Sequence, residues 1–490
     1  MPTRLLEISR TSRGLHLQLH ETEAGTVEPY AALSYCWGGP QPVLTNVANL
    51  EEHLAGIDVD ELPKSLQDAL VITEELGLSY VWVDALCIIQ DSKTDVAIHI
   101  STMAPVYLNA TVVIGASRSR AVRDGFLGPR ISPEQNYSGT EVVIRMRFRQ
   151  LGGKEGSMVL VPFTNSQFEP IDARAWTYQE RLLSLRFLEY GSVQTQWFCS
   201  GISEKEAWVD GLDRPTLSME RGNVGLMGAH AVMRDPARSL GNDHDHQLFD
   251  LWEEVIRDHS TRQITVATDR LPALGGIAQR FAEALKVEGD EYLCGLWKGD
   301  LAHLLMWLHP SQSSQLRPTQ FVAPSWSWAS MNSPVEFYTR QRMPFARFDR
   351  QTHISFEFVS RDIKLVDERS PFGAIVSGSI KVKGILTPAE WDRSRPVGEG
   401  WQMKFGGTTV SDNDLWPMMD EEPGEGVYPV SLLAVRETPS RCIEGLILRA
   451  DDEGHFSRLG TFCYLNDRDN GSLAKLLWSQ ALEARVVELI

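Results

Sequence analysis

Two short polar segments in the first hundred residues carry side chains suited to proton transfer. Tyr35, Cys36 and Trp37 follow the run AALS at 31–34, and Asp84 follows the apolar run YVWV at 80–83. The carboxyl ends of parallel strands meet at one edge of a sheet, where ligands bind. We therefore predict that Asp84 and Tyr35 are catalytic acid–base groups at this edge, and that Trp37 and Cys36 contact the substrate.

His99 is the third catalytic candidate, because an imidazole changes charge near neutral pH. It lies one turn inside a helix that we expect Asp95 to cap, at the border of that helix's apolar stripe. From there the ring can point to the same edge as Asp84. Structural roles are the alternatives: His99 then donates to a backbone carbonyl and Asp84 caps a turn. Tyr35 and Trp37 would then pack beneath the loop.

Other residues of these segments, and of a helical segment RAWTYQER at 174–181, are expected to contact the substrate. Cys87 lies between two apolar residues, which favours a buried, unreactive thiol. The 174–181 segment either contacts a polar ligand or forms a salt-bridged helix between two layers, and the sequence favours neither. The full set of expected contact residues is Trp37, Cys36, Cys87, Gln90, Asp91, Arg174, Trp176, Gln179 and Glu180.

We predict no metal site and no cofactor. The 6 cysteines include no CxxC pair, and the triplet His244-Asp245-His246 has no third ligand at a recognisable spacing, so a solvated loop is expected there. The sequence contains no GxxxxGK[ST], GxSxG or HExxH motif and no strand-linked GxGxxG. These absences disfavour P-loop ATPases, α/β-hydrolases, zinc proteases and Rossmann dehydrogenases.

Charge and composition limit the classes of molecule that we expect the protein to bind. The 490 residues carry a net charge of −18, which repels a phosphate backbone, so no nucleic acid is expected. No signal peptide and no membrane-spanning run is recognisable, so we expect a cytoplasmic protein that does not bind a membrane. A small-molecule ligand or substrate is the expected partner, and self-association into a homo-oligomer is compatible with the sequence.

The order of the elements predicts an α/β fold. A helix from 62 to 77 and another from 95 separate three β-rich runs at 31–35, 80–84 and 111–116. This β-α-β-α-β order indicates a parallel sheet with helices on both faces. We expect this core at 1–200, a linker or loop region at 201–246, a helical segment at 247–320 and a β-rich C-terminal unit at 321–490.

Five segments resemble, in order and spacing, the core of the fungal heterokaryon-incompatibility (HET) domain. They read ALSYCWG at 32–38, LP at 62–63 with DA at 68–69, LG at 76–77 leading to WVDALCIIQD at 82–91, Met103 with Tyr107 and NA at 109–110, and RAWTYQERLLS at 174–184. Further segments resemble the C-terminal part of stand-alone HET proteins: DRLPALGGIA at 269–278, GLW at 295–297 and APSWSWA at 323–329.

The resemblance implies a TIR-like fold and a role in nonself recognition and regulated cell death. Some TIR domains cleave NAD, and many HET sequences read DWxxE where TIR domains carry the catalytic glutamate. This chain reads DVAIH at 95–99, so His99 replaces that glutamate. A neutral imidazole cannot stabilise an oxocarbenium-like centre as a carboxylate does, so NAD cleavage is not expected.

The resemblance and the candidate residues lead to two functional hypotheses. The first is a HET-family protein that works as a cofactor-independent acid–base enzyme, a cyclase, lyase or hydrolase, on a small fungal secondary metabolite. The second is a nonself-recognition cell-death effector that works by association.

Overall fold

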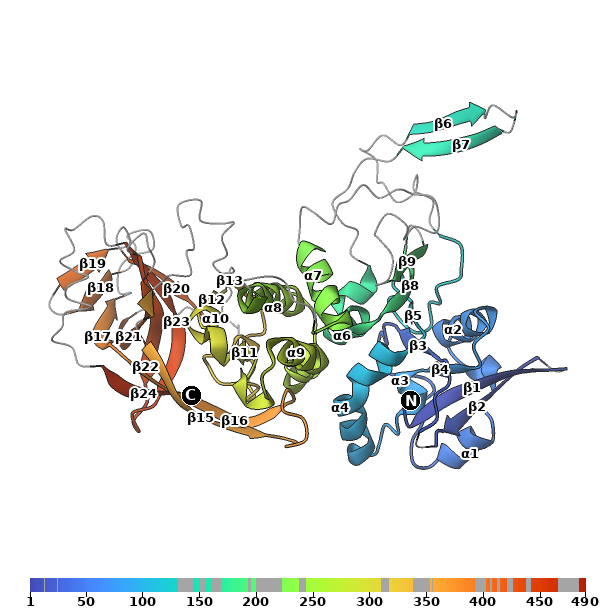
Figure 1. The fold of residues 1–490 in the computed structure, drawn as a ribbon, viewed down its shortest axis with the longest axis horizontal. Coiled ribbons are helices and arrows are strands. Elements are labelled where there is room, and N and C mark those ends of the chain that lie inside the picture. Colours follow the sequence, from blue (N-terminus) through green and yellow to red (C-terminus); the bar gives the residue numbers. More distant parts are fainter. Residues whose placement is uncertain are drawn as a thin grey trace. The chain divides into compact units, whose positions relative to one another are not determined.

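The computed structural model describes two compact units, Met1–Asp235 and Pro236–Ile490, each of which is considered by itself (Figure 1). The structure describes residues 1–12, 14–23, 25–130, 144–149, 153, 155–160, 169–192, 195–199, 223–237, 244–309, 317–337, 353–354, 356–392, 402–405, 408–411, 415–420, 426–437, 442–465 and 484–490. Within these residues, no helix combines the length and the apolar character that crossing a bilayer requires.

A 7-stranded mixed sheet forms the centre of the first unit, with the order β2-β1-β4-β3-β5-β8-β9. Strands β4, β3, β5 and β8 are parallel to one another, and β3, β4 and β5 are the three strands predicted for the parallel core. Strands β1, β2 and β9, on the two sides of these four, pair antiparallel, so the sheet is mixed. The strands are β1 Arg4–Thr11, β2 Gly14–Glu21, β3 Ala31–Ser34, β4 Tyr80–Trp82, β5 Val112–Gly115, β8 Arg186–Tyr190 and β9 Thr195–Cys199, and β6 Ile144–Arg149 and β7 Glu155–Leu160 form a separate hairpin.

Helices connect these parallel strands. The chain leaves β3 through α2 to reach β4 on one side, and returns through α4 to β5 on the other side of β3. Because such crossovers are right-handed, the two helices cover opposite faces of the sheet, and α6 packs against α4 (Figure 1). The helices are α1 Leu50–Ala55, η1 Val59–Glu61, α2 Lys64–Glu75, α3 Asp84–Cys87, α4 Lys93–Asn109, η2 Pro170–Ala173, α6 Ala175–Leu183 and α7 Asn223–Arg234.

Two local predictions differ from the structure. Helix α4 is capped by Ser92, whose hydroxyl accepts from Asp95 N, so Asp95 lies in the first turn instead of at the cap. The expected linker at 201–246 contains α7, which packs against α6, and His244 begins α8 instead of lying in a loop. Residues 201–222 and 238–243 of that expected linker lie outside the described part of the chain.

The second unit begins with helices and ends in a sheet, in the order that the sequence indicates. The helical part contains α8 His244–Ser260, η5 Ala267–Asp269, α9 Pro272–Leu285, η6 Gly289–Glu291, η7 Lys298–Asp300, α10 Leu301–Leu304 and η8 Trp328–Ser330, with the short strands β10 Tyr292–Leu293, β11 Leu296–Trp297, β12 Trp307–Leu308 and β13 Glu336–Phe337. The expected helical segment at 247–320 is thus not helical throughout, because Trp307 pairs with Phe337 in a strand.

An 11-stranded sheet makes up the rest of the second unit, and β15-β16-β24-β23-β22-β21-β17-β18-β19 is its main path. Its strands are β14 His353–Ile354, β15 Phe356–Leu365, β16 Ile375–Gly384, β17 Leu386–Asp392, β18 Gln402–Phe405, β19 Thr408–Ser411, β20 Leu415–Met419, β21 Val427–Glu437, β22 Cys442–Ala450, β23 Phe456–Leu465 and β24 Arg485–Leu489. Most neighbouring strands are antiparallel, and the sheet makes this part of the chain β-rich, as the sequence predicts.

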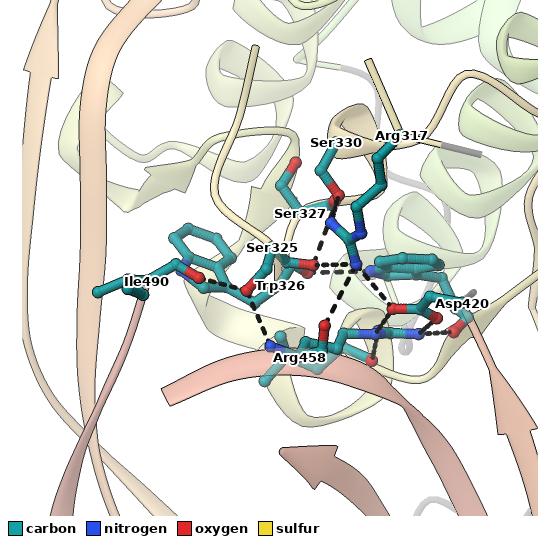
Figure 2. A network of polar contacts seen from close by, with 10 residues as sticks. Arg317, Ser325, Trp326, Ser327, Ser330, Asp420, Arg458 and Ile490 are labelled. Atoms are coloured by element: carbon teal, nitrogen blue, oxygen red, sulfur yellow. Dashed lines mark hydrogen bonds and ion pairs between the residues drawn. The ribbon is translucent and has the colours of Figure 1, made fainter. Parts of the chain in front are cut away.

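Arg458 holds the helical part of the second unit to this sheet (Figure 2). Its guanidinium donates to Asp420 at 2.9 and 3.0 Å and to the carbonyl of Leu305 at 2.7 Å. It also lies over the Trp307 ring, with Cζ 3.3 Å from the centroid. Because Arg458 is 2% exposed, these bonds replace the hydration that the charge loses on burial.

Candidate functional site

Asp84 is the centre of a hydrogen-bonded group at the carboxyl ends of β3 and β4. Its Oδ1 accepts from Tyr35 Oη at 2.8 Å and from Ala85 N at 2.7 Å, and its Oδ2 accepts from Trp37 Nε1 at 2.8 Å. The structure thus brings together three side chains that the sequence places 47 and 49 positions apart. The carboxylate fixes both aromatic side chains at the predicted edge of the sheet.

The turn after Trp37 depends on glycine. Gly38 has φ +67°, and a Cβ there would lie 2.2 Å from Ala121 Cβ. The close approach allows Val122 N to donate to Trp37 O at 3.2 Å. The Trp-Gly pair therefore lets the chain bend sharply where β3 ends, which turns the Trp37 indole toward Asp84.

Glu180 and Arg174 add a second carboxylate and a cation to this group. Glu180 is 5% exposed, and one of its oxygens accepts from the Ser34 hydroxyl at the end of β3. Arg174 Nη1 donates to the carbonyl of Tyr35 at 2.9 Å. We call Tyr35, Trp37, Asp84, Arg174 and Glu180 the strand-end cluster.

The pKa values in the strand-end cluster follow from burial and mutual charge. Burial raises the pKa of Glu180 to about 7, the Ser34 hydroxyl opposes this rise, and the negative charge of Asp84 adds to it. Burial also raises the pKa of Asp84, although the bonds from Tyr35 and Trp37 and the charge of Arg174 lower it. The pKa of Tyr35 is raised far above its usual value by burial and by Asp84. Glu180 is thus the member of the cluster best able to gain and lose a proton near neutral pH.

The two thiols near the strand-end cluster are buried. Cys36 is 4% exposed and burial raises its pKa to about 11, while Cys87 is 0% exposed and burial raises its pKa to about 12. A nucleophilic cysteine needs the thiolate form. The protonated thiols agree with the unreactive alternative that the sequence favours for Cys87, and they give Cys36 the same character.

The remaining expected contact residues have local partners. Gln90 Nε2 donates to the carbonyls of Asp84 at 2.9 Å and Ile88 at 3.2 Å, and Asp91 Oδ1 accepts from Val47 N at 2.9 Å. These bonds hold the loop before α4 in place. Gln179 is 1% exposed and Trp176 is half-buried, and both lie on α6 with Glu180.

His99 belongs to a different set of contacts. Its Nε2 lies 3.0 Å from Arg4 Nη2, 3.3 Å from Thr3 Oγ1 and 3.6 Å from Asp95 Oδ2. Arg4 also pairs with Asp95 and donates from Nε to the carbonyl of Cys87 at 2.9 Å. Burial, with the charge of Arg4, lowers the pKa of His99, although Asp95 raises it.

Among the described residues, the side-chain contacts of His99 are with Arg4, Thr3 and Asp95, and none of them is with Asp84 or Tyr35, the other two catalytic candidates. In the described part of the chain, His99 and Asp84 share no hydrogen bond. The reason is Arg4, a β1 residue that the sequence does not mark as functional. Because a guanidinium has no acceptor, it donates to His99 Nε2 and keeps the ring neutral. No motif spacing reveals this contact, since 95 positions separate the two residues.

Three residues of the second unit bring potential metal ligands within 4.8 Å of one another: Glu253, Asp300 and His303. His303 Nε2 lies 2.8 Å from Glu253 Oε1, and its Nδ1 lies 2.5 Å from Arg436 Nη1. Since Arg436 can only donate, Nδ1 accepts and the proton of the neutral ring lies on Nε2. In this form neither ring nitrogen offers a free lone pair to a metal ion, so we propose no metal here.

Residues 30–180 match the family model described as heterokaryon incompatibility protein (HET). The match begins just before β3 and ends at Glu180, so it covers the parallel strands β3, β4 and β5 and the whole strand-end cluster. No curated protein and no solved structure is significantly similar to the chain. Residues 30–180 thus form a HET domain, and the chain is a HET-domain protein.

Proposed function

We propose that the HET domain of this protein is a small-molecule enzyme in which Glu180 transfers the proton. The proposal rests on one observation: Glu180 is 5% exposed, lies in the strand-end cluster, and has a pKa of about 7. A group with a pKa near the working pH can act as an acid in one step and as a base in the next. Strongly shifted carboxylates beside a cation are also typical of active sites.

In this proposal, Asp84 positions the side chains around Glu180, and Arg174 provides a positive charge. Asp84 uses both oxygens to hold Tyr35, Trp37 and the α3 backbone, so we assign it a positioning role. Arg174 is a permanent cation whose charge acts on Asp84 and on Glu180. A substrate that carries an anionic or carbonyl oxygen would suit that charge.

Proton transfer alone supports cyclisation, elimination or hydrolysis, and these remain the proposed reaction classes. A small fungal metabolite remains the proposed substrate, and the cytoplasm the proposed location. His99 is not part of this mechanism, because its Nε2 accepts from Arg4. We also propose that the protein does not cleave NAD, since His99 replaces the expected glutamate; release of nicotinamide by the purified chain would contradict this.

Cell-death signalling is the second candidate function, and membership in the HET family favours it. Under this hypothesis the strand-end cluster stabilises the fold, and the domain works by association. A TIR-like ancestry would fit this candidate equally well.

Expression of the full chain in a filamentous fungus, under an inducible promoter, tests the two candidates together. The wild-type protein is compared with Glu180→Gln, which keeps an acceptor for Ser34 but cannot transfer a proton. An enzyme changes the metabolite profile only in its wild-type form. Growth arrest by both proteins, with unchanged metabolites, would instead support the effector and remove Glu180 from any catalytic role.

A further inference from the structure

A groove of about 480 Å³ lies in the first unit, apart from the residues of the strand-end cluster. The loop at 41–49, helix α1 and the segment at 56–61 line it. A hollow of this size is typical of small-molecule sites. The ionised side chains that line it are all acidic: Glu52, Asp58 and Glu61.

His53 is the buried residue of this lining and has a defined tautomer. The Thr45 hydroxyl donates its only proton to the carbonyl of Leu86 at 2.6 Å, so Thr45 Oγ1 can only accept from His53 Nδ1, 2.8 Å away. Nδ1 therefore carries the proton of the neutral ring, and Nε2 is an acceptor. Burial lowers the pKa of His53, although Glu52 raises it, so the ring is neutral at pH 7.

His53 Nε2 has no hydrogen-bond partner among the described residues, although the residue is only 7% exposed. The atom is not closed off from solvent, so a molecule in the groove can donate a hydrogen bond to it. Gln41, which also lines the groove, donates from Nε2 to the carbonyls of Trp37 and Gly39, while its Oε1 has no partner in the described part of the chain. The groove therefore offers acceptors and negative charge to a ligand.

A single metal ion does not fit this arrangement. In the described part of the chain, the ligand atoms of Glu52, His53, Asp58 and Glu61 do not form a group of three within 4.8 Å. Acceptors that are spread along a groove suit a longer molecule with several donors. Protonated amines meet both requirements, since each ammonium carries positive charge and up to three N–H donors.

We propose that this groove binds a small organic cation of the diamine or polyamine class. One N–H of the ligand donates to His53 Nε2, and the ammonium groups face Glu52, Asp58 and Glu61. The site is separate from the proposed catalytic cluster, although α3 contributes to both: Asp84 belongs to the cluster, and the Leu86 carbonyl orients Thr45 and, through it, His53.

Calorimetric titration of the full chain with spermidine tests the proposal. Glu52→Gln and Glu61→Gln each remove one exposed charge from the lining without disturbing a hydrogen bond of the described structure. We expect each to weaken binding by about threefold or more. Glu51→Gln is the matched control: it lies on the same helix, is exposed, does not line the groove and changes the net charge equally.

The His53→Phe variant removes the acceptor at similar size, and we expect it to weaken spermidine binding about tenfold. Circular dichroism of each variant verifies the fold, and Glu52→Gln keeps the test valid if His53→Phe does not fold. Three results would overturn the proposal: no binding of spermidine by the wild type, equal weakening by Glu51→Gln, which indicates nonspecific attraction to an acidic protein, or tighter binding of Mg²⁺ than of spermidine.

Discussion

Tyr35 donates its phenolic proton to Asp84 at 2.8 Å, and this bond joins the carboxyl ends of two neighbouring parallel strands. The carboxylate oxygen that accepts it also accepts from Ala85 N in the first turn of α3. One side chain therefore fixes the loop after β3, the start of α3 and the position of Trp37. Its removal should disturb all three elements at once.

We expect Asp84→Asn to destabilise the first unit by about 1–3 kcal/mol, because an amide has one acceptor oxygen and cannot accept from Tyr35, Trp37 and Ala85 together. The lower free energy of unfolding should be measurable as a lower urea midpoint and as faster hydrogen exchange in peptides from β3 and α3. Asp60→Asn, at an exposed carboxylate of η1, is the control and should leave both measurements unchanged. Equal effects of the two variants would show that Asp84 is not a structural centre.

Glu180 should make the stability of the first unit depend on pH. Its pKa is about 7 in the folded chain against an ordinary value of 4.5, a difference worth about 3 kcal/mol. Because the folded-state pKa is raised, this stability is fully present below pH 4.5 and is lost as the pH rises through 7. Urea midpoints of Glu180→Gln should therefore change less between pH 5 and 8 than those of the wild type, and parallel curves would contradict the assignment.

The carboxyl-end edge was predictable from sequence because parallel strands follow a simple topological rule. The runs before Tyr35 and Asp84 are short and apolar, and helices separate them, so their ends had to meet. Helical periodicity likewise located α2 within a few residues. The antiparallel edges were harder to foresee, since an alternating run such as 14–21 fits any edge strand and does not indicate its neighbour.

Hydrogen bonds between distant segments explain what the sequence could not predict about the site. Helix geometry alone suggested that His99 points toward the same edge as Asp84, but it could not reveal the contact with Arg4, a residue without motif context. His53 was not recognised either, because its tautomer depends on a Thr45 hydroxyl and on a carbonyl in α3. Hydrogen bonds between distant segments leave no periodic trace in a sequence.

Arg4 should stabilise the first unit by joining β1, α3 and α4. Arg4→Met leaves the Asp95 carboxylate and the Cys87 carbonyl without their cation, and we expect a loss of about 2 kcal/mol in urea unfolding. Arg10→Met, on the same strand, is the comparison: Arg10 is solvent-exposed in its pair with Glu74, and little change is expected. A loss no greater than that of Arg10→Met would show that the contacts of Arg4 with Asp95 and Cys87 do not stabilise the unit.

His99, which contacts Arg4, should make the stability of the first unit depend on pH as well. Burial lowers its pKa below the ordinary 6.5, so its contribution to stability is present above pH 6.5 and is lost as the pH falls. His99→Gln cannot be protonated, so its urea midpoint should fall less than that of the wild type between pH 7 and 5. In the fungal host the same variant should keep the metabolite profile of the wild type. A lost profile in a stably folded His99→Gln protein would return His99 to the mechanism.

In the second unit, substitution of Arg458 tests whether its ion pair with Asp420 stabilises the joint between the helical part and the sheet. Arg458→Met keeps an apolar side chain near Trp307 but removes the main cation of Asp420, which is 1% exposed. Among the described residues, the 3.1 Å contact with Arg317 is then the ion pair that Asp420 keeps (Figure 2). A buried carboxylate that loses its main cation should lower the stability of the unit by about 3 kcal/mol, visible as an earlier thermal transition. The double variant Arg458→Met with Asp420→Leu removes both charges and should recover part of that loss.

Arg449→Met, at an exposed position of β22, is the control and should leave the thermal transition unchanged. If the double variant is no more stable than Arg458→Met, packing around the guanidinium, rather than its charge, holds the two parts together.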